Sequence, residues 1–295
     1  VAFTDANSQR DEKDVYRAVN DIHDYYQPFD PNYGYVNARI SANVSRNSTC
    51  NAYWDGTINF YIQGGGCANT GQIMGVVHHE FCHGISNDLL GGQGTEGIGE
   101  GNSDILSNLM TRDPVIGRGF YLNNCTSGIR NSQNNMQYPE DKNGTIHHDG
   151  QIIAGFQWDA TQLLEAQYGQ EEGNLMAATR WHFARRLQRP TSQPAQVLAT
   201  FVADDDDGDL TNGTPNYDIY CTAARNHDTD DDAFHCPEIL VGVFITHSPL
   251  SSRTEAGDAE VLARITSTEG ALVPDSLRLN YRFNGGEFVS VRLMP

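Results

Sequence analysis

The residues whose types and spacing could do chemistry most directly are His79, Glu80 and His83, which form an H-E-x-x-H pattern. The surrounding segment, QIMGVVHHEFCHGISNDLL, has apolar residues at helical intervals. Four residues are just over one helical turn, so the two imidazoles project side by side and can share one tetrahedral metal ion. The pattern therefore predicts a zinc site, with Glu80 beside it as a general base.

A catalytic zinc ion needs a third protein ligand and an open position, and Glu100 is the candidate for this ligand. It lies in the segment GIGEGNSDIL, which opens a second predicted helix. Asp104 follows one turn later on the same face, where we expect it to accept a hydrogen bond from a liganding histidine. The alternative is that both acidic residues only cap a surface helix.

Two other residues near the motif could bind a metal but face elsewhere. At about 100° per residue, Cys82 lies on the opposite side of His79 from Glu80, so we expect it to form a disulfide or to pack. His78 faces another side again, and we expect it to be a bystander.

These residues resemble those of the thermolysin-like gluzincins, and in particular the fungalysin branch, from about residue 14 to about residue 159. The segment NAYWDG, residues 51–56, is similar to the N-A-F-W-N-G segment of thermolysin, an edge strand that pairs with the substrate main chain. The resemblance implies that Asn51 and Ala52 bind substrate in this way. The alternative for Asn51 is an ordinary turn residue.

Two further segments carry the resemblance. The segment GIR, residues 128–130, resembles the G-I-R of fungalysins, which implies that Arg130 holds a substrate carbonyl. The segment IHHDG resembles the family's V-H-x-x-G stretch, which implies that His147 faces the tetrahedral intermediate. A surface arginine and a loop histidine are the alternatives. No tyrosine stands at the family's usual spacing, so Tyr138 is a weak candidate for the missing donor.

The resemblance implies a zinc metalloendopeptidase that hydrolyses internal peptide bonds and prefers a bulky apolar residue after the cleaved bond. In the implied mechanism zinc polarises a water, Glu80 accepts its proton, and zinc and His147 stabilise the oxyanion. An aminopeptidase is the rival enzyme, but the chain lacks a G-x-M-E-N-like segment for the substrate amino terminus. A binding module with a vestigial zinc site is disfavoured, since ligands and base are all present.

The sequence patterns around these residues predict an α+β fold. The resemblance implies that this fold is that of a thermolysin-like zincin. Residues 1–71 predict a small β-rich N-terminal lobe, with a helix over residues 12–26 and strand patterns from residue 35 to residue 62. This lobe is shorter than its counterpart in thermolysin. Residues 72–236 alternate helical patterns with polar loops and predict a mainly helical zinc-binding lobe.

Residues 237–295 change to period-two patterns, with a hairpin turn predicted at Asn284-Gly285-Gly286. They predict part of a β-sandwich-like domain. We expect this domain to be incomplete, because an immunoglobulin-like sandwich needs roughly 100 residues.

The six cysteines lack the C-x-x-C spacing of a structural zinc site, so we expect disulfides. Sequence proximity favours Cys50 with Cys67 and Cys221 with Cys236, which leaves Cys82 with Cys125 by elimination. Disulfides predict an oxidising compartment and hence a secreted, extracellular protein. The first residues lack a signal-peptide pattern, so we expect that peptide to be gone already. The resemblance implies a propeptide before maturation.

The chain is strongly acidic, with a formal net charge of -19. This charge repels nucleic-acid phosphates and anionic lipid surfaces, so we expect neither as a partner. The expected partners are peptide or protein substrates.

Five aspartates surround Gly208 ahead of a predicted helix. One interpretation is a structural calcium ion bound by Asp205, Asp207 and Asp209, and the other is a solvated acidic cap. An EF-hand frame does not fit, because Ala203 and Thr214 would occupy positions one and twelve, where Asp and Glu are needed.

Overall fold

The computed structural model describes residues 3–231, 233–239, 243–247, 260–267, 277–282 and 286–292. The chain divides into two compact units, Val1–Gly208 with Thr214–Pro237, and Asp209–Gly213 with Glu238–Pro295. All the predicted site residues except Asp209 therefore lie in the first unit.

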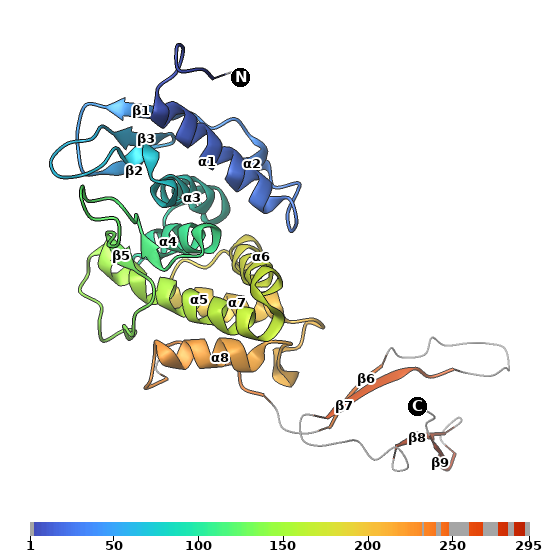
Figure 1. The fold of residues 1–295 in the computed structure, drawn as a ribbon. Helices are drawn as coiled ribbons and strands as arrows, with labels where there is room; N and C mark the ends of the chain where they lie inside the picture. The colour runs from blue at the N-terminus through green and yellow to red at the C-terminus, as the bar shows by residue number, and fades with distance from the viewer. Residues whose placement is uncertain are drawn as a thin grey trace. The chain divides into compact units, whose positions relative to one another are not determined.

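The first unit combines a small sheet with a body of helices, in agreement with the predicted α+β class (Figure 1). Its helices are α1 (Arg10–Tyr26), α2 (Gly34–Asn37), η1 (Thr70–Gln72), α3 (Met74–Leu90), α4 (Ile98–Thr111), α5 (Ile146–Tyr168), α6 (Gln170–Gln188), α7 (Gln193–Asp204) and α8 (Tyr217–Asn226). Its strands are β1 (Ala42–Arg46), β2 (Ala52–Trp54), β3 (Ile58–Tyr61), β4 (Val115–Ile116) and β5 (Arg130–Asn131).

The three-stranded sheet has the order β1-β3-β2, with β1 parallel and β2 antiparallel to β3. One apolar cluster joins this sheet to two helices: Val15 and Ala18 of α1 and Val77 of α3 pack with Ile58 and Phe60 of β3. The cluster fixes the edge strand β2 against the helix that carries the H-E-x-x-H motif.

The helix predicted over residues 12–26 is confirmed as α1, which buries the apolar face that its sequence periodicity indicates. The strand predicted from residue 35 is wrong at its start, because residues 34–37 form the helical turn α2. This turn buries both Tyr33 and Val36, which a single extended segment with alternating faces would not do.

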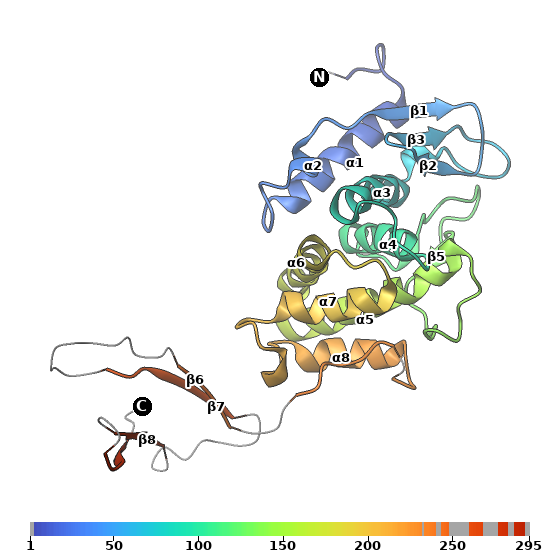
Figure 2. The ribbon, with the colours of Figure 1, turned by 180° about the vertical axis from the view of Figure 1, so that it is seen from behind.

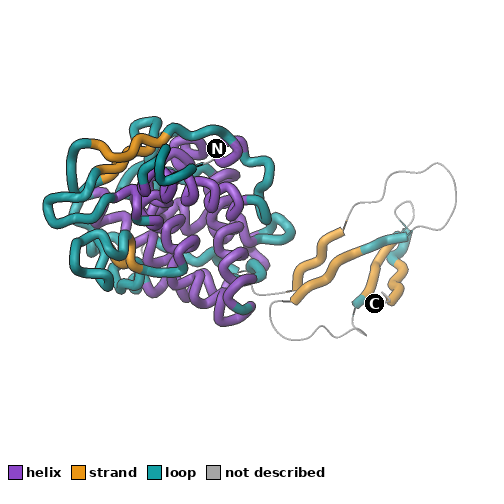
Figure 3. Tube along the Cα trace, turned by 45° about the horizontal axis from the view of Figure 1, so that its top comes forward, coloured by secondary structure: helices purple, strands orange, loops and turns teal. Residues whose placement is uncertain are grey.

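The helices form the larger part of the first unit. α3 and α4 lie side by side, α5 packs on α4, and α6 and α8 pack on α5 (Figures 1 and 2). Figure 3 shows the sheet at one side of this helical body. Both α3 and α4 are buried over most of their surface, so the polar side chains that they carry inside need partners. Among the described residues, no helix has the length and apolar character to span a membrane.

The described residues of the second unit form two antiparallel strand pairs, in addition to η2 (Leu210–Asn212). β6 (Val243–His247) pairs with β7 (Ala263–Ser267), and β8 (Arg278–Tyr281) pairs with β9 (Val289–Arg292). The predicted turn residues Asn284 and Gly285 lie outside the described residues. A β-sandwich-like domain here stays a prediction.

Two of the three predicted disulfides are present, Cys50–Cys67 and Cys221–Cys236. The third predicted pair is wrong, because Cys82 and Cys125 are both free. Cys82 is buried in α3, where its thiol donates to the carbonyl oxygen of Asn102 at 3.2 Å. Cys125 is exposed in the loop before β5. The pair was predicted only because the other four cysteines had been assigned, and the fold does not bring these two together.

We expect a thiol reagent to titrate one thiol in the native protein and two after denaturation without reduction. Exposed Cys125 should react in the native state, whereas buried Cys82 needs the protein to unfold. If no thiol reacts in denaturant, the prediction of a third disulfide is correct after all. The variant Cys125→Ser is the control and should lose only the fast thiol.

Candidate metal centre and cleft

A short glycine-rich loop, residues 91–97, reverses the chain between α3 and α4. Gly91 ends α3 with φ 75° and Gly97 caps the start of α4 with φ 73°. Both values lie in the left-handed region, which glycine adopts without the steric cost of a Cβ. The reversal places the first turn of α4, which contains Glu100, opposite the motif face of α3.

α4 also approaches the start of α5 very closely. A Cβ at Gly97 would lie 2.3 Å from a backbone carbonyl oxygen of α5, and a Cβ at Gly101 would lie 2.6 Å from another. Only glycine fits at such distances. The contact brings Nε2 of His147, on α5, to 3.4 Å from Oε2 of Glu100.

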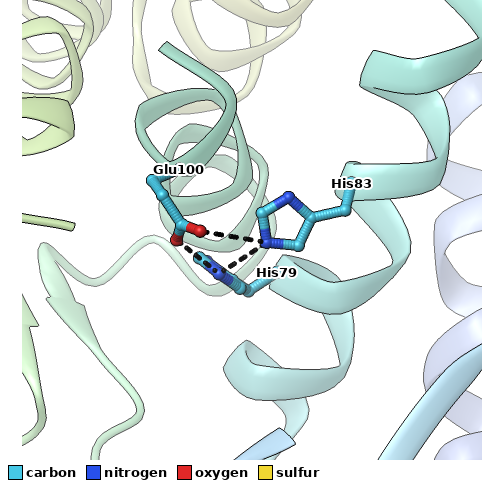
Figure 4. A group of neighbouring side chains, drawn as sticks. All are labelled: His79, His83 and Glu100. Atoms are coloured by element: carbon cyan, nitrogen blue, oxygen red, sulfur yellow. Dashed lines mark hydrogen bonds and ion pairs between the residues drawn. The ribbon is translucent and has the colours of Figure 1, made fainter. Parts of the chain in front are cut away.

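His79, His83 and Glu100 point their ligand atoms at one another (Figure 4). Nε2 of His79 lies 3.3 Å from Oε2 of Glu100 and 3.2 Å from Nε2 of His83, and the latter lies 3.6 Å from Oε1 of Glu100. Each side chain offers one ligand atom, and these atoms lie within 4.8 Å of one another. Two imidazole nitrogens and one carboxylate are the donor set of a catalytic zinc site, so these residues fit that metal.

Asp104 links His79 to Arg130 of β5. Its Oδ1 lies 2.8 Å from Nδ1 of His79 and accepts from Nη2 of Arg130 at 2.7 Å, and its Oδ2 accepts from Nε of Arg130 at 2.7 Å. Burial alone would raise the pKa of Asp104, but Arg130 and His79 hold this pKa well below its usual range. Asp104 therefore makes the contact predicted for it, as an ionised group.

Arg130, predicted to hold a substrate carbonyl, lines the cleft and is nearly buried. Two of its nitrogens are bonded to Asp104. The sequence did not predict this pairing, since the two residues lie far apart in the chain.

Gln93 is a site residue that the sequence did not indicate. Its Oε1 lies 3.0 Å from Nδ1 of His83, and its Nε2 donates to the carbonyl oxygen of the same residue at 2.9 Å. Gln93 lies in the glycine-rich loop, where no periodicity or motif marks it. In the sequence, only its position between the two segments that contain the zinc ligands could have pointed to it.

Glu80 has a buried carboxyl group that lines the same cleft. Burial is the main reason that its pKa rises to about 7, with the negative charge of Glu100 adding to this effect and the positive charges of His79 and Arg130 opposing it. A carboxyl group with such a pKa can both accept and donate a proton near neutral pH.

A cleft of about 520 Å³ opens over these residues. Asn51 and Ala52, predicted to bind substrate, line it from the side of β2, and His147 lines it from α5. The structure thus brings the predicted zinc, base and substrate residues together around one space. Its apolar lining includes Val76, Ile116, Phe120 and Ile129.

Tyr138 does not belong to this cleft, so the suggestion that it supplies the missing donor is wrong. Its hydroxyl donates to Oε2 of Glu96 at 2.7 Å, and its ring stacks on Phe234. His78 is buried beside the motif without a polar partner among the described residues, and burial lowers its pKa to about 4.

Carboxylate oxygens of Asp205, Asp206 and Asp207 lie within 4.8 Å of one another. Asp205 accepts from the backbone N–H of Gly208 at 2.6 Å. Asp209 belongs to the other unit and accepts from the backbone N–H of Thr211. Calcium binding in this region stays a prediction.

Comparison with known proteins identifies the chain. The model of the family described as Fungalysin metallopeptidase matches residues 60–204, which contain α3, α4 and all three predicted zinc ligands. The match covers just under half of the chain and shows that this part is similar to fungalysin metallopeptidases. The chain is a zinc metallopeptidase, and the resemblance seen in the sequence is confirmed.

The fold of this chain is similar to that of the precursor of protealysin, a metalloproteinase from Serratia proteamaculans. The TM-score is 0.58 at 13% sequence identity, over 76% of this chain and 80% of the other. At this identity the similarity shows the fold alone. No curated protein matched the sequence.

The buried pair of Asp104 and Arg130 should stabilise this protein apart from any metal. We expect Asp104→Asn to lower the free energy of unfolding of the metal-free protein by about 3 kcal/mol, because the nearly buried Arg130 would lose the carboxylate to which it is hydrogen-bonded. Urea unfolding monitored by circular dichroism measures it. Asp113→Asn, in the exposed pair with Arg118, is the control and should change little. Equal effects of both substitutions would contradict the structural role of Asp104.

Proposed function

We propose that this protein is a secreted endopeptidase that hydrolyses internal peptide bonds, with Glu80 as general base and His79, His83 and Glu100 as the ligands of one zinc ion. The observation that carries the proposal is the cleft itself, which contains a three-residue donor set and a separate carboxyl group of raised pKa. A zinc ion bound there would supply the Lewis acid that polarises the water and the scissile carbonyl.

Glu80 is proposed to accept a proton from the attacking water at a carboxylate oxygen and to pass it to the leaving nitrogen. A pKa of about 7 suits both steps, since the same group must be a base first and an acid afterwards. His147 is proposed to donate a hydrogen bond to the oxyanion. Its side chain is 61% exposed and borders Glu100, so a substrate can reach it.

The substrate is proposed to bind as an extended strand along β2, through Asn51 and Ala52. Among the described strands, β2 pairs with β3 alone, so its other edge is available for main-chain hydrogen bonds. Arg130, which also lines the cleft, is proposed to bind a substrate carbonyl. The apolar side chains Val76, Phe120 and Ile129 support a preference for a bulky apolar residue after the cleaved bond.

Secretion is supported by the two disulfides, which form and persist in oxidising compartments. A propeptide before maturation is supported by the similar fold of protealysin, whose solved structure is that of a precursor. We also keep the proposal that residues 237–295 are part of a β-sandwich-like domain, which the two strand pairs support.

We expect the enzyme to cleave an internally quenched peptide with both ends blocked and an apolar residue at the cut. A zinc chelator should abolish cleavage, and added zinc should restore it, because three protein ligands leave one position open. Fluorescence gives the rate, and mass spectrometry gives the cut. Cleavage only of peptides with a free amino terminus would favour an aminopeptidase instead.

Three substitutions should separate the proposed roles. Glu80→Gln should keep about one equivalent of zinc and lose nearly all turnover. Glu100→Gln should weaken zinc binding and recover part of its activity in excess zinc, because a neutral amide replaces an anionic ligand. His147→Ala should keep zinc and lower kcat about 100- to 1000-fold.

Zinc content and kcat, measured for all three variants, decide between these roles. If Glu80→Gln loses the metal while Glu100→Gln keeps both metal and activity, base and ligand have been exchanged in our assignment.

A further inference from the structure

Each of the two motif histidines has its Nδ1 facing a different kind of acceptor. His79 faces the carboxylate of Asp104, at 2.8 Å. His83 faces the amide oxygen of Gln93, at 3.0 Å. We propose that Gln93 is a positioning residue that fixes the tautomer and the ring orientation of His83, and that it thereby sets the zinc affinity of the site. This inference rests on the proposed use of His83 as a zinc ligand.

The orientation of the Gln93 amide follows from its second contact. Nε2 of Gln93 lies 2.9 Å from the carbonyl oxygen of His83, an atom that can only accept. The NH₂ group must therefore face this carbonyl, which leaves Oε1 facing Nδ1 of His83. An amide oxygen can only accept as well, so Nδ1 carries the proton.

A neutral histidine has one protonated ring nitrogen, so Nε2 of His83 is left with its lone pair. This nitrogen faces the other ligand atoms, 3.2 Å from Nε2 of His79 and 3.6 Å from Oε1 of Glu100. The two contacts of Gln93 thus select the tautomer that can bind a metal. The two hydrogen bonds hold His83 at its ring and at its backbone carbonyl, so they also fix the orientation of the ring.

Packing against α4 holds the Gln93 side chain in place. A Cβ at Gly99 would lie 2.7 Å from Oε1 of Gln93 and 2.8 Å from its backbone oxygen. Gly99 directly precedes Glu100, so one loop residue contacts both helices that supply ligands. A neutral amide also adds no charge to a site in which Glu80, Glu100 and Asp104 are already acidic.

The test compares zinc affinities of full-length variants by competition with a chromophoric chelator. Gln93→Leu keeps the size but removes the acceptor, and we expect its zinc Kd to rise about 10- to 100-fold. Gln93→Glu keeps an acceptor oxygen for Nδ1 of His83 but loses the donor to the carbonyl oxygen, so its Kd should rise less than that of Gln93→Leu. Gln133→Leu, at an exposed position outside the cleft lining, is the control.

The pair of variants separates orientation from packing. If Gln93 only fills space, Leu should be tolerated and Glu should be the more harmful change, and this order would overturn the proposal. Should the Leu variant not fold, as judged by circular dichroism, Gln93→Ala takes its place with the same expectation. ¹⁵N NMR of the His83 ring in the metal-free protein gives an independent measure, with the proton on Nδ1 expected for Gln93 and Glu and its loss from Nδ1 expected for Leu.

The outcomes for this inference and for the proposed function are distinct. If the unsubstituted enzyme binds no zinc or cleaves no blocked peptide, the proposed function fails. If it does both and Gln93→Leu has an unchanged Kd, only the role of Gln93 is wrong.

Discussion

The close approach of α4 to its neighbours is the constraint on which the rest of the site depends. Glycines remove the side chains that would otherwise hold α4 away from α5 and from the loop at residue 93. Because the helices touch through their backbones, Glu100 in the first turn of α4 faces two histidines of α3 and a third on α5. Larger residues at these positions would move the ligand, and the geometry of a metal site tolerates little displacement.

The charges of the site create a second constraint. Glu80, Glu100 and Asp104 are acidic and buried. Burial alone would lower the pKa of His79, but Asp104 and Glu100 raise it to about 10, so without a metal His79 is a cation in the cleft, as is Arg130. Burying like charges together lowers the stability of a protein unless cations offset them. These cations offset Glu100 and Asp104, whose pKa values are lowered, and leave Glu80 with a raised pKa. A divalent cation that binds only the native state would raise the free energy of unfolding further by mass action. The unfavourable electrostatics that remain are those of the buried Glu80 carboxyl group, the proposed general base.

The sequence predicts those parts of the site that depend on local spacing. His79 and His83 lie one helical turn apart, and Glu100 and Asp104 repeat this relation on the next helix, so helical periodicity alone relates the members of each pair. Gln93 was not predicted because it lies in an irregular loop, where no periodicity relates it to the ligands. Elimination failed for Cys82, since its partner in the fold is a backbone oxygen and not sulfur. In each failure a distant contact, invisible to periodicity, decided the outcome.

The free edge of β2 has a consequence for the targets of the enzyme. An edge strand recognises the main chain, and a segment within a native helix or sheet has already used its N–H and C=O groups. If substrates bind along β2 as proposed, a cut requires several consecutive residues to be extended and without internal partners. Exposed loops and frayed ends meet this condition at little cost, whereas a core strand must first open locally. Native proteins would then be selected mainly by the local stability of their backbones, and the side chain after the cut would choose only among the segments that open.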